Sequence, residues 1–170
     1  MEQITKEELL DVIGKFELGD NTEVVSVEPY GSGHINDTFR LEVKEDGQEK
    51  LYILQRMNKD IFKNQKELME NILQVTSFLT DKIKAQGGDP NRETLQVIPT
   101  KEEKCYLIEA NGDGWRVYPF ITDSLSFDKA DTPEAMKKSG YAFGNFQYLL
   151  SDFPAEKLHE TIPDFHNTVD

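Results

Sequence analysis

The chain has 170 residues, 37% hydrophobic and 10% aromatic, which suits one ordinary domain or two small lobes and argues against a disordered segment. Its formal charge of −13 argues against nucleic acid or an anionic membrane surface as main partner, because both require a basic face. Cys105 is the single cysteine, so no disulfide can form within the chain. The sequence shows no signal-peptide pattern and no apolar run near the ~20 residues of a membrane span, so we expect a cytoplasmic protein.

The first part of the chain predicts a short helix followed by three antiparallel strands. Thr5 and Glu8 have the spacing of a capping box, and apolar residues recur at helical spacing after them. From Val24 the apolar period changes to two, and Asp46-Gly47 is a typical hairpin turn. Leu51 to Leu54 form a continuous apolar run, which is expected of a strand covered on both faces.

The second part of the chain predicts a long helix, three more strands and another helix. The long helix is expected over Asn64–Ala85, where apolar residues form a stripe. The segments "TLQVIPT" (94–100), "CYLIEA" (105–110) and "WRVYPFI" (115–121) are predicted strands. Thr132-Pro133-Glu134 begins a helix that runs through Leu150. The predicted fold class is α+β, an antiparallel sheet with helices.

The loop from Gly31 to Asp37, "GSGHIND", is either a phosphate-binding loop or only a hairpin turn. A Rossmann fingerprint needs a third glycine that opens a helix, but Asn36 stands there and a strand follows. The Gly-Lys-Ser/Thr of a Walker loop is also absent. A kinase-type glycine hairpin fits the strand order better, and its glycines let backbone N–H groups approach phosphate oxygens. His34 could donate to a phosphate or could simply be polar surface.

A kinase-type site also needs a cation on the third strand and an acid on the following helix. The third strand ends in Gln55-Arg56, and these side chains point to opposite faces. We expect Arg56 to contact the phosphates because a glutamine cannot neutralise their charge; the alternative is a solvated arginine. Glu70 has plausible spacing for the acid, but it lies off the apolar stripe of its helix and could equally be a surface glutamate.

Six segments, in this order, carry a resemblance to a known family: "GSGHINDTFRL", "YILQRMN", "IFKNQKELMENILQVT", "WRVYPFI", "AFGNFQYLLSDFP" and "LHETIPDFHNT". They resemble the N-terminal part of N-acetylhexosamine 1-kinases, which belong to the aminoglycoside-phosphotransferase group of kinase-like enzymes. The resemblance runs from about Tyr30 to Thr168 and covers most of the chain.

The resemblance implies a kinase-like N-lobe over residues 1–121 and the start of a helical C-lobe over residues 122–170. It implies ATP-dependent phosphorylation of a sugar hydroxyl, with Arg56 as the phosphate cation. The implied phosphate loop consists of Gly31, Ser32, Gly33, His34, Ile35, Asn36, Asp37 and Thr38. The implied hinge, whose backbone meets the adenine edge, consists of Tyr118, Pro119, Phe120 and Ile121. The alternative for Tyr118 and Phe120 is ordinary core.

The chain departs from the family pattern at its catalytic loop. Such kinases need His-x-Asp-x-x-x-x-Asn and a later metal-binding aspartate, and His166-Asn167-Thr168 has no aspartate two residues after its histidine. We therefore expect the N-terminal part of an enzyme. This part would bind ATP, would lack the Mg²⁺ ligands and would not transfer phosphate alone, since positioning and metal charge supply most of the rate.

The partners and the acceptor remain open at this level. The same fold could act on an aminoglycoside, choline or homoserine hydroxyl, or the chain could be a non-catalytic module that binds a nucleotide or a protein. Met136, Phe143, Phe146 and Leu150 lie on or near one face of the 132–150 helix. An exposed apolar face of this kind predicts self-association through that helix.

Overall fold

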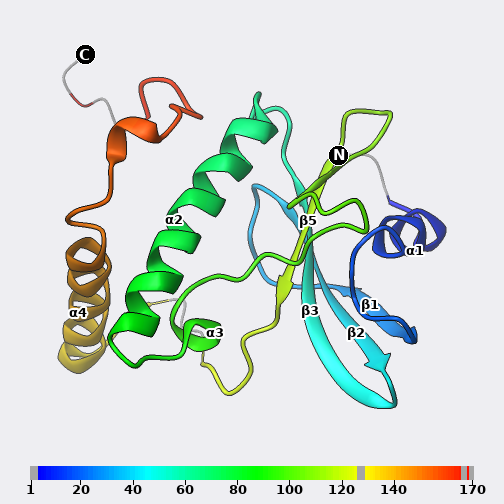
Figure 1. Ribbon diagram of the computed structural model, residues 1–170, viewed down its shortest axis with the longest axis horizontal. Coiled ribbons are helices and arrows are strands. Elements are labelled where there is room, and N and C mark those ends of the chain that lie inside the picture. Colours follow the sequence, from blue (N-terminus) through cyan, green and yellow to red (C-terminus); the bar gives the residue numbers. More distant parts are fainter. Residues whose placement is uncertain (1–3, 126–128, 166–167, 169–170) are drawn as a thin grey trace. The chain divides into compact units, whose positions relative to one another are not determined.

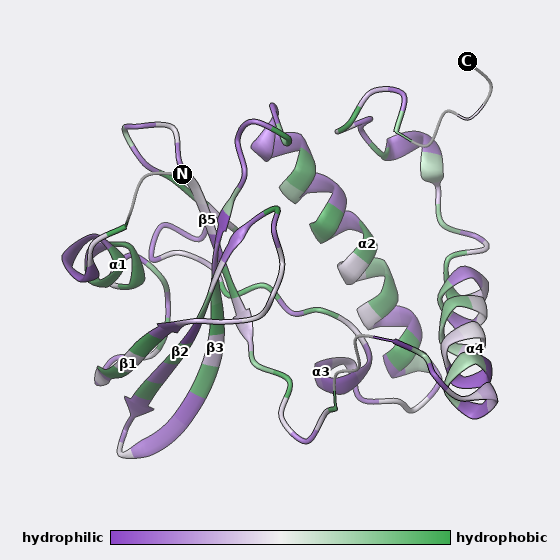
Figure 2. Ribbon diagram, turned by 180° about the vertical axis from the view of Figure 1, so that it is seen from behind, coloured by the Kyte–Doolittle hydropathy of each residue, from purple (hydrophilic) through white to green (hydrophobic). Residues whose placement is uncertain are grey.

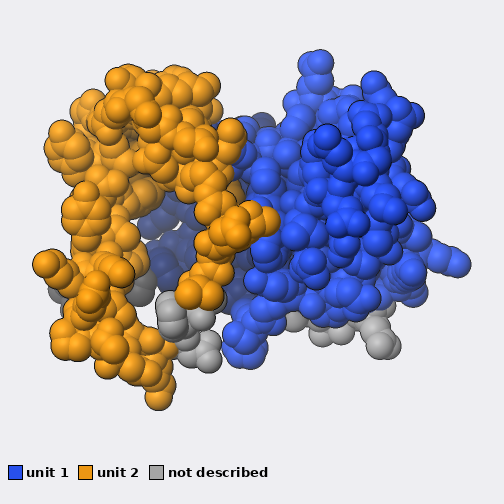
Figure 3. Space-filling model, turned by 90° about the horizontal axis from the view of Figure 1, so that it is seen from below, with its two compact units in different colours: residues 1–73, 96–120, 159–170 blue, residues 74–95, 121–158 orange. Residues whose placement is uncertain are grey.

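The computed structural model describes residues 4–125, 129–165 and 168. The chain divides into two compact units, coloured separately in Figure 3: residues 1–73, 96–120 and 159–170 in unit 1, and residues 74–95 and 121–158 in unit 2. One boundary lies one residue before the predicted end of the N-lobe at Ile121. Unit 2 also takes part of the long helix, and unit 1 takes the C-terminal tail, so the predicted division into two kinase-like lobes stays a prediction.

Unit 1 contains a five-stranded antiparallel sheet in the order β1-β2-β3-β5-β4 (Figure 1). Its strands are β1 (Thr22–Pro29), β2 (Asp37–Glu45), β3 (Gln48–Met57), β4 (Leu107–Ile108) and β5 (Gly114–Pro119). This sheet, together with the helices, confirms the predicted α+β class. The predicted strand over 94–100 is wrong, because this segment makes only isolated bridges at Ile98 and Thr100. Of the predicted strand over 105–110, only the two residues of β4 are in a strand.

Two hairpins join the first three strands. The turn between β2 and β3 places Asp46 at φ 49° and Gly47 at φ 81°. Two consecutive positive φ angles match the twist of a tight hairpin, as the Asp-Gly pair predicts. The loop between β1 and β2 is closed by the backbone N–H of Tyr30, which donates to the carbonyl of Thr38 over 2.8 Å. The glycine loop is therefore a hairpin connection at one end of the sheet.

The sheet has two different faces, since residues directly opposite one another on neighbouring strands point to the same side. The core face is covered by α1 (Lys6–Ile13), whose predicted capping box of Thr5 and Glu8 is present. The core face carries the buried residues Phe39, Leu41, Val43, Tyr52, Leu54, Trp115 and Val117. The polar face carries Thr38, Arg40, Ile53, Gln55, Arg116 and Tyr118.

Helix α2 (Gln65–Ala85) begins where the sequence predicts, because the Asn64 side chain accepts from the backbone N–H of Glu67 over 3.2 Å. Apolar and polar bands alternate along it in Figure 2. In its first half, which belongs to unit 1, Met69 is fully buried and its sulfur lies 3.7 Å from Nη1 of Arg116. The residues before the unit boundary therefore touch the polar face of the sheet.

Unit 2 contains the second half of α2 with α3 (Pro90–Glu93), α4 (Pro133–Leu149) and a 3₁₀ turn over Ala155–Lys157. Its small core consists of Leu79, Ile83 and Leu149, with Val75 and Leu150 packed against it. The predicted start of α4 is confirmed by its Thr132 cap.

The predicted association surface on α4 is largely exposed. Met136, Phe143 and Phe146 expose 60%, 70% and 47% of their surface, whereas Leu150 packs on the core of unit 2. Self-association through this face stays a prediction. In the part of the chain that the structure describes, no helix has both the length and the apolar character needed to cross a membrane.

Candidate functional site

The glycine loop is anchored at one end and open at the other. The backbone N–H of Asn58 donates to Oδ1 of Asn36, and Nδ2 of Asn58 donates to the carbonyl of Ile35, each over 2.9 Å. Among the described residues, the backbone N–H groups from Gly31 to His34 have no acceptor, and these residues are exposed. The glycine half of the loop therefore presents free amide donors.

Glycine at position 33 is not required by the loop itself. Gly31 has φ +82°, which favours glycine, but Gly33 does not have a positive φ. A Cβ built at Gly33 meets no atom within 4 Å. A ligand that approaches the backbone closely would give this glycine a role that the free loop does not.

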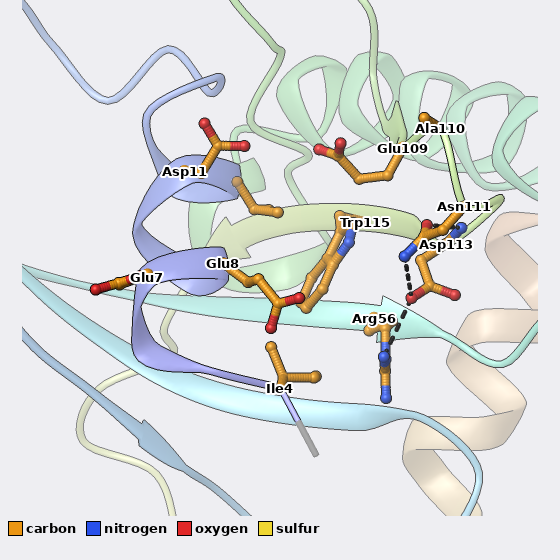
Figure 4. A pocket seen from close by; sticks show the side chains of 11 residues that line it. Ile4, Glu7, Glu8, Asp11, Arg56, Glu109, Ala110, Asn111, Asp113 and Trp115 are labelled. Atoms are coloured by element: carbon orange, nitrogen blue, oxygen red, sulfur yellow. Dashed lines mark hydrogen bonds and ion pairs between the residues drawn. The ribbon is translucent and has the colours of Figure 1, made fainter. Parts of the chain in front are cut away.

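Arg56 lies on the core face, away from the side chains of Gln55 and Tyr118. Its guanidinium pairs with Asp37 over 2.7 Å. It also pairs with Asp113 over 3.1 Å and lies over the Trp115 ring (Figure 4). Only 12% of the Arg56 side chain is exposed. Two carboxylates therefore neutralise this cation. That Arg56 contacts phosphate stays a prediction, and its two ion pairs argue against it.

The pocket beside Arg56 is acidic. It has a volume of about 810 Å³ and lies between α1 and the end of the sheet (Figure 4). The carboxylates that line it belong to Glu7, Glu8, Asp11, Glu109 and Asp113. A phosphate in this pocket would meet repulsion from these groups, which exceeds the attraction of one arginine that is already paired. This pocket is therefore unsuited to a nucleotide phosphate.

Asp113 connects two cations at this edge of the sheet. Burial pushes its pKa upward, but a hydrogen bond from Lys59 and the charges of Arg56 and Lys59 outweigh burial and hold the pKa of Asp113 below its ordinary value. The carboxylate is 13% exposed, so solvent screens these contacts only in part. Asp113 is therefore expected to stabilise the fold in its ionised form.

We expect Asp113→Asn to lower the free energy of unfolding at pH 7 by about 1–3 kcal/mol, because it weakens the contacts of a nearly buried guanidinium. A carboxyl group whose pKa is lower in the folded protein stabilises the fold at pH values above its unfolded-state pKa of about 3.9. This contribution is lost as the pH falls through the pKa of the folded state. The difference between the two proteins should therefore shrink below about pH 4 in urea unfolding. Glu102→Gln, which removes an exposed pair with Lys104, is the control and should change nothing. A difference that stays constant from pH 7 to pH 3 would contradict this role.

Glu70 does not serve as the acid that holds a strand cation. Its carboxylate lies 2.9 Å from Nε2 of His159 and 3.7 Å from Nζ of Lys66. Next to it, the side chain of Asn71 exchanges two 2.8 Å hydrogen bonds with the backbone of His159. The sequence left open whether Glu70 pairs with Arg56. In the structure Glu70 instead pairs with His159 and Lys66, while Arg56 lies on the core face of the sheet.

Gln55 organises the polar face. Its Oε1 accepts hydrogen bonds from Nε and Nη2 of Arg116, over 3.0 and 2.6 Å, and from the Tyr118 hydroxyl over 2.7 Å. Its Nε2 donates to Oγ1 of Thr38 over 2.9 Å. These bonds form a row across β2, β3 and β5 that begins at Thr38, where the glycine loop ends. Sequence reasoning missed Arg116, and the only signal was its alternation with Tyr118 in "WRVYPFI".

The charge of Arg116 has no counter-ion among the residues that the structure describes. Among the described residues no carboxylate pairs with it, whereas Arg56 has two. Its neighbours are neutral: the Gln55 amide, the sulfur of Met69 and the Tyr118 ring, whose centroid lies 5.6 Å away. The guanidinium is partly buried, so this face of the sheet attracts anions.

The predicted hinge begins at Tyr118, which bonds to Gln55, and continues along the chain to Ile121. The backbone N–H of Phe120 donates to the carbonyl of Leu51 over 2.9 Å, and its ring meets Tyr30 edge-on at 5.3 Å between centroids. Because Tyr30 precedes the glycine loop, the loop base and the end of β5 touch. Pro119 and Ile121 are exposed. That these backbone groups meet an adenine edge stays a prediction.

A search against protein-family models finds no match for the chain. Among the residues that the structure describes, no group of three or more His, Cys, Asp or Glu side chains is arranged to hold a metal ion. The resemblance to sugar kinases therefore remains an expectation. The geometry of the glycine loop and the polar face carries the functional interpretation.

Proposed function

We propose that this chain is the nucleotide-binding part of an ATP-dependent small-molecule kinase, and that the acceptor is a sugar hydroxyl. One observation carries the proposal: an exposed glycine hairpin adjoins the face of an antiparallel sheet that bears Arg116. Among the described residues, the amides of the hairpin have no acceptor and the arginine has no carboxylate partner. Amide donors together with a guanidinium are the groups that bind phosphate oxygens. The sugar as acceptor rests on the resemblance alone.

The residues present fit a nucleoside triphosphate in three places. The amides from Gly31 to His34 would donate to phosphate oxygens, and Gly33 would allow the backbone to approach them. Thr38 and the row behind it would face the phosphate chain from the sheet. The backbone from Tyr118 to Ile121 would meet the adenine edge. Magnesium would neutralise phosphate charge in such a complex, and the described residues offer no cluster that would hold it.

The Gly33→Val variant tests the loop. We expect it to weaken ATP binding about tenfold or more, because its side chain would displace at least one charge-assisted contact worth about 1.5–3 kcal/mol. Its melting temperature should stay near that of the wild type, since the new side chain meets no atom of the loop. Calorimetric titration measures the affinity, and thermal unfolding provides the control.

Gly33→Ala should fall between the wild type and Gly33→Val, because its side chain is smaller. If both variants bind ATP as the wild type does, the loop is only a hairpin turn. If the wild type binds neither ATP nor adenosine, the proposed function itself is wrong.

A further inference from the structure

We propose that Arg116, on β5, is the residue that contacts the phosphates of the bound nucleotide, and that Gln55 positions it. This inference rests on the proposed function and names the cation that the third strand was expected to supply. It transfers that role from Arg56 on the core face to Arg116 on the polar face. It also assigns a positioning role to Gln55, which carries no charge of its own.

Arg56 and Arg116 differ in the charge of their neighbours. Arg56 has two carboxylate partners, at 2.7 and 3.1 Å, so an incoming phosphate would have to compete with both. Arg116 is bonded only to neutral groups within the described chain. A guanidinium that is partly buried without a counter-ion is costly, and an anionic ligand would offset that cost. Of the two arginines on neighbouring strands, Arg116 is the one that gains from binding phosphate.

The position of the Arg116 guanidinium also suits a ligand at the glycine loop. Because Nε and Nη2 of Arg116 both donate to Gln55, the guanidinium leans over β3, one strand away from Thr38. Strands lie about 4.8 Å apart, so this places the cation close to the end of the glycine loop. A guanidinium has five N–H donors, and the described acceptors, Gln55 and the Met69 sulfur, use three of them. Donors on both Nη atoms remain for a ligand.

The side-chain amide of Gln55 is held in one orientation by hydrogen bonds to both its nitrogen and its oxygen. Its nitrogen donates to Thr38, so its oxygen must face Arg116 and Tyr118. A glutamate at position 55 would form an ion pair with Arg116 and would neutralise the charge that attracts a phosphate. A neutral glutamine orients the arginine and leaves its charge available. A glutamine at position 55 therefore suits a phosphate site better than a glutamate would, although acidic residues are common in this protein.

The test measures selectivity for phosphates by calorimetry with ATP, adenosine and inorganic tripolyphosphate. Arg116→Met should weaken ATP and tripolyphosphate about tenfold or more, and should change adenosine less than about twofold. Gln55→Glu should do the same without loss of thermal stability, because it replaces a neutral contact by an ion pair. Arg56→Met removes the same charge from the core face and should leave the ratio of ATP to adenosine affinity unchanged.

Four results would overturn the inference. If Arg116→Met weakens ATP and adenosine equally, or weakens neither, Arg116 does not contact phosphate. If Gln55→Glu binds ATP as the wild type does, the charge of Arg116 is not used. If Arg56→Met alone lowers phosphate selectivity, the cation is Arg56, and the proposed function stands without this inference. A wild type that binds none of the three ligands would overturn the inference and the proposed function together.

Discussion

Leu54→Ala is expected to lower the free energy of unfolding by about 2–5 kcal/mol, the cost of deleting a large side chain from a well-packed core. Leu54 is fully buried at the centre of β3, on the core face, and it belongs to the cluster that joins the sheet to α1. Its neighbours across the strands are Phe39 and Val117, both buried. Urea unfolding at neutral pH, followed by far-UV circular dichroism, measures the loss.

Ile53→Ala is the matched control, one residue away on the opposite face. Ile53 is only partly buried, and it faces Arg40 and Tyr118 on the neighbouring strands. Its truncation removes as many carbon atoms but leaves a site that solvent can reach, so its cost should be clearly smaller. Equal losses at Leu54 and Ile53 would contradict the division of the sheet into a core face and a polar face.

Gly114→Ala is expected to cost about 1–3 kcal/mol, because there is no room for a methyl group at the start of β5. A Cβ at Gly114 would lie 1.5 Å from Oε1 of Gln65 and 2.9 Å from Cε of Met57. Both neighbours are buried, so neither can move freely. The Gln65 side chain also donates to the carbonyl of Gly112 over 3.4 Å, which ties the start of α2 to the turn before β5.

A double-mutant cycle identifies the cause of this loss. Gln65→Ala removes the colliding side chain, so Gly114→Ala should cost much less in that background. Gly140→Ala provides the comparison, because a Cβ at Gly140 meets nothing within 4 Å. In the interior of α4 this change should stabilise slightly, by about 0.5–1 kcal/mol. A loss at Gly114 that is equal with and without Gln65 would show that the collision is not its cause.

Local patterns in the sequence predicted most of the regular structure. The capping box at Thr5, the Asp46-Gly47 turn and the Thr132 cap are each present, because all three depend on contacts within four residues. The prediction failed at 94–100, an apolar run that contains Pro99. It reads as a strand by composition, but its only β-bridges within the described part of the chain join Ile98 to Val117 and Thr100 to Phe16. Whether an apolar run joins a sheet depends on edges that distant residues supply.

The candidate site was harder to predict than the fold. Alternation along β3 showed that Gln55 and Arg56 point to opposite faces, but not which face α1 covers. The apolar run from Leu51 to Leu54 concealed this, since both of its faces carry apolar residues. Arg116 and Asp113 lie some 60 residues further along the chain, and only the pairing of β5 with β3 brings them to Gln55 and Arg56. A local pattern cannot report a register between distant strands.

The central claim is that phosphates bind at the glycine hairpin and on the polar face of the sheet. The most direct test is a titration of the ¹⁵N-labelled chain with ATP and with adenosine, followed by backbone amide and arginine Nε resonances. Our account predicts that ATP, but not adenosine, shifts the amides of Gly31 to His34 and the Nε of Arg116, while the Nε of Arg56 stays in place. Shifts confined to Arg56 and the indole of Trp115, or no shift with ATP, would contradict it.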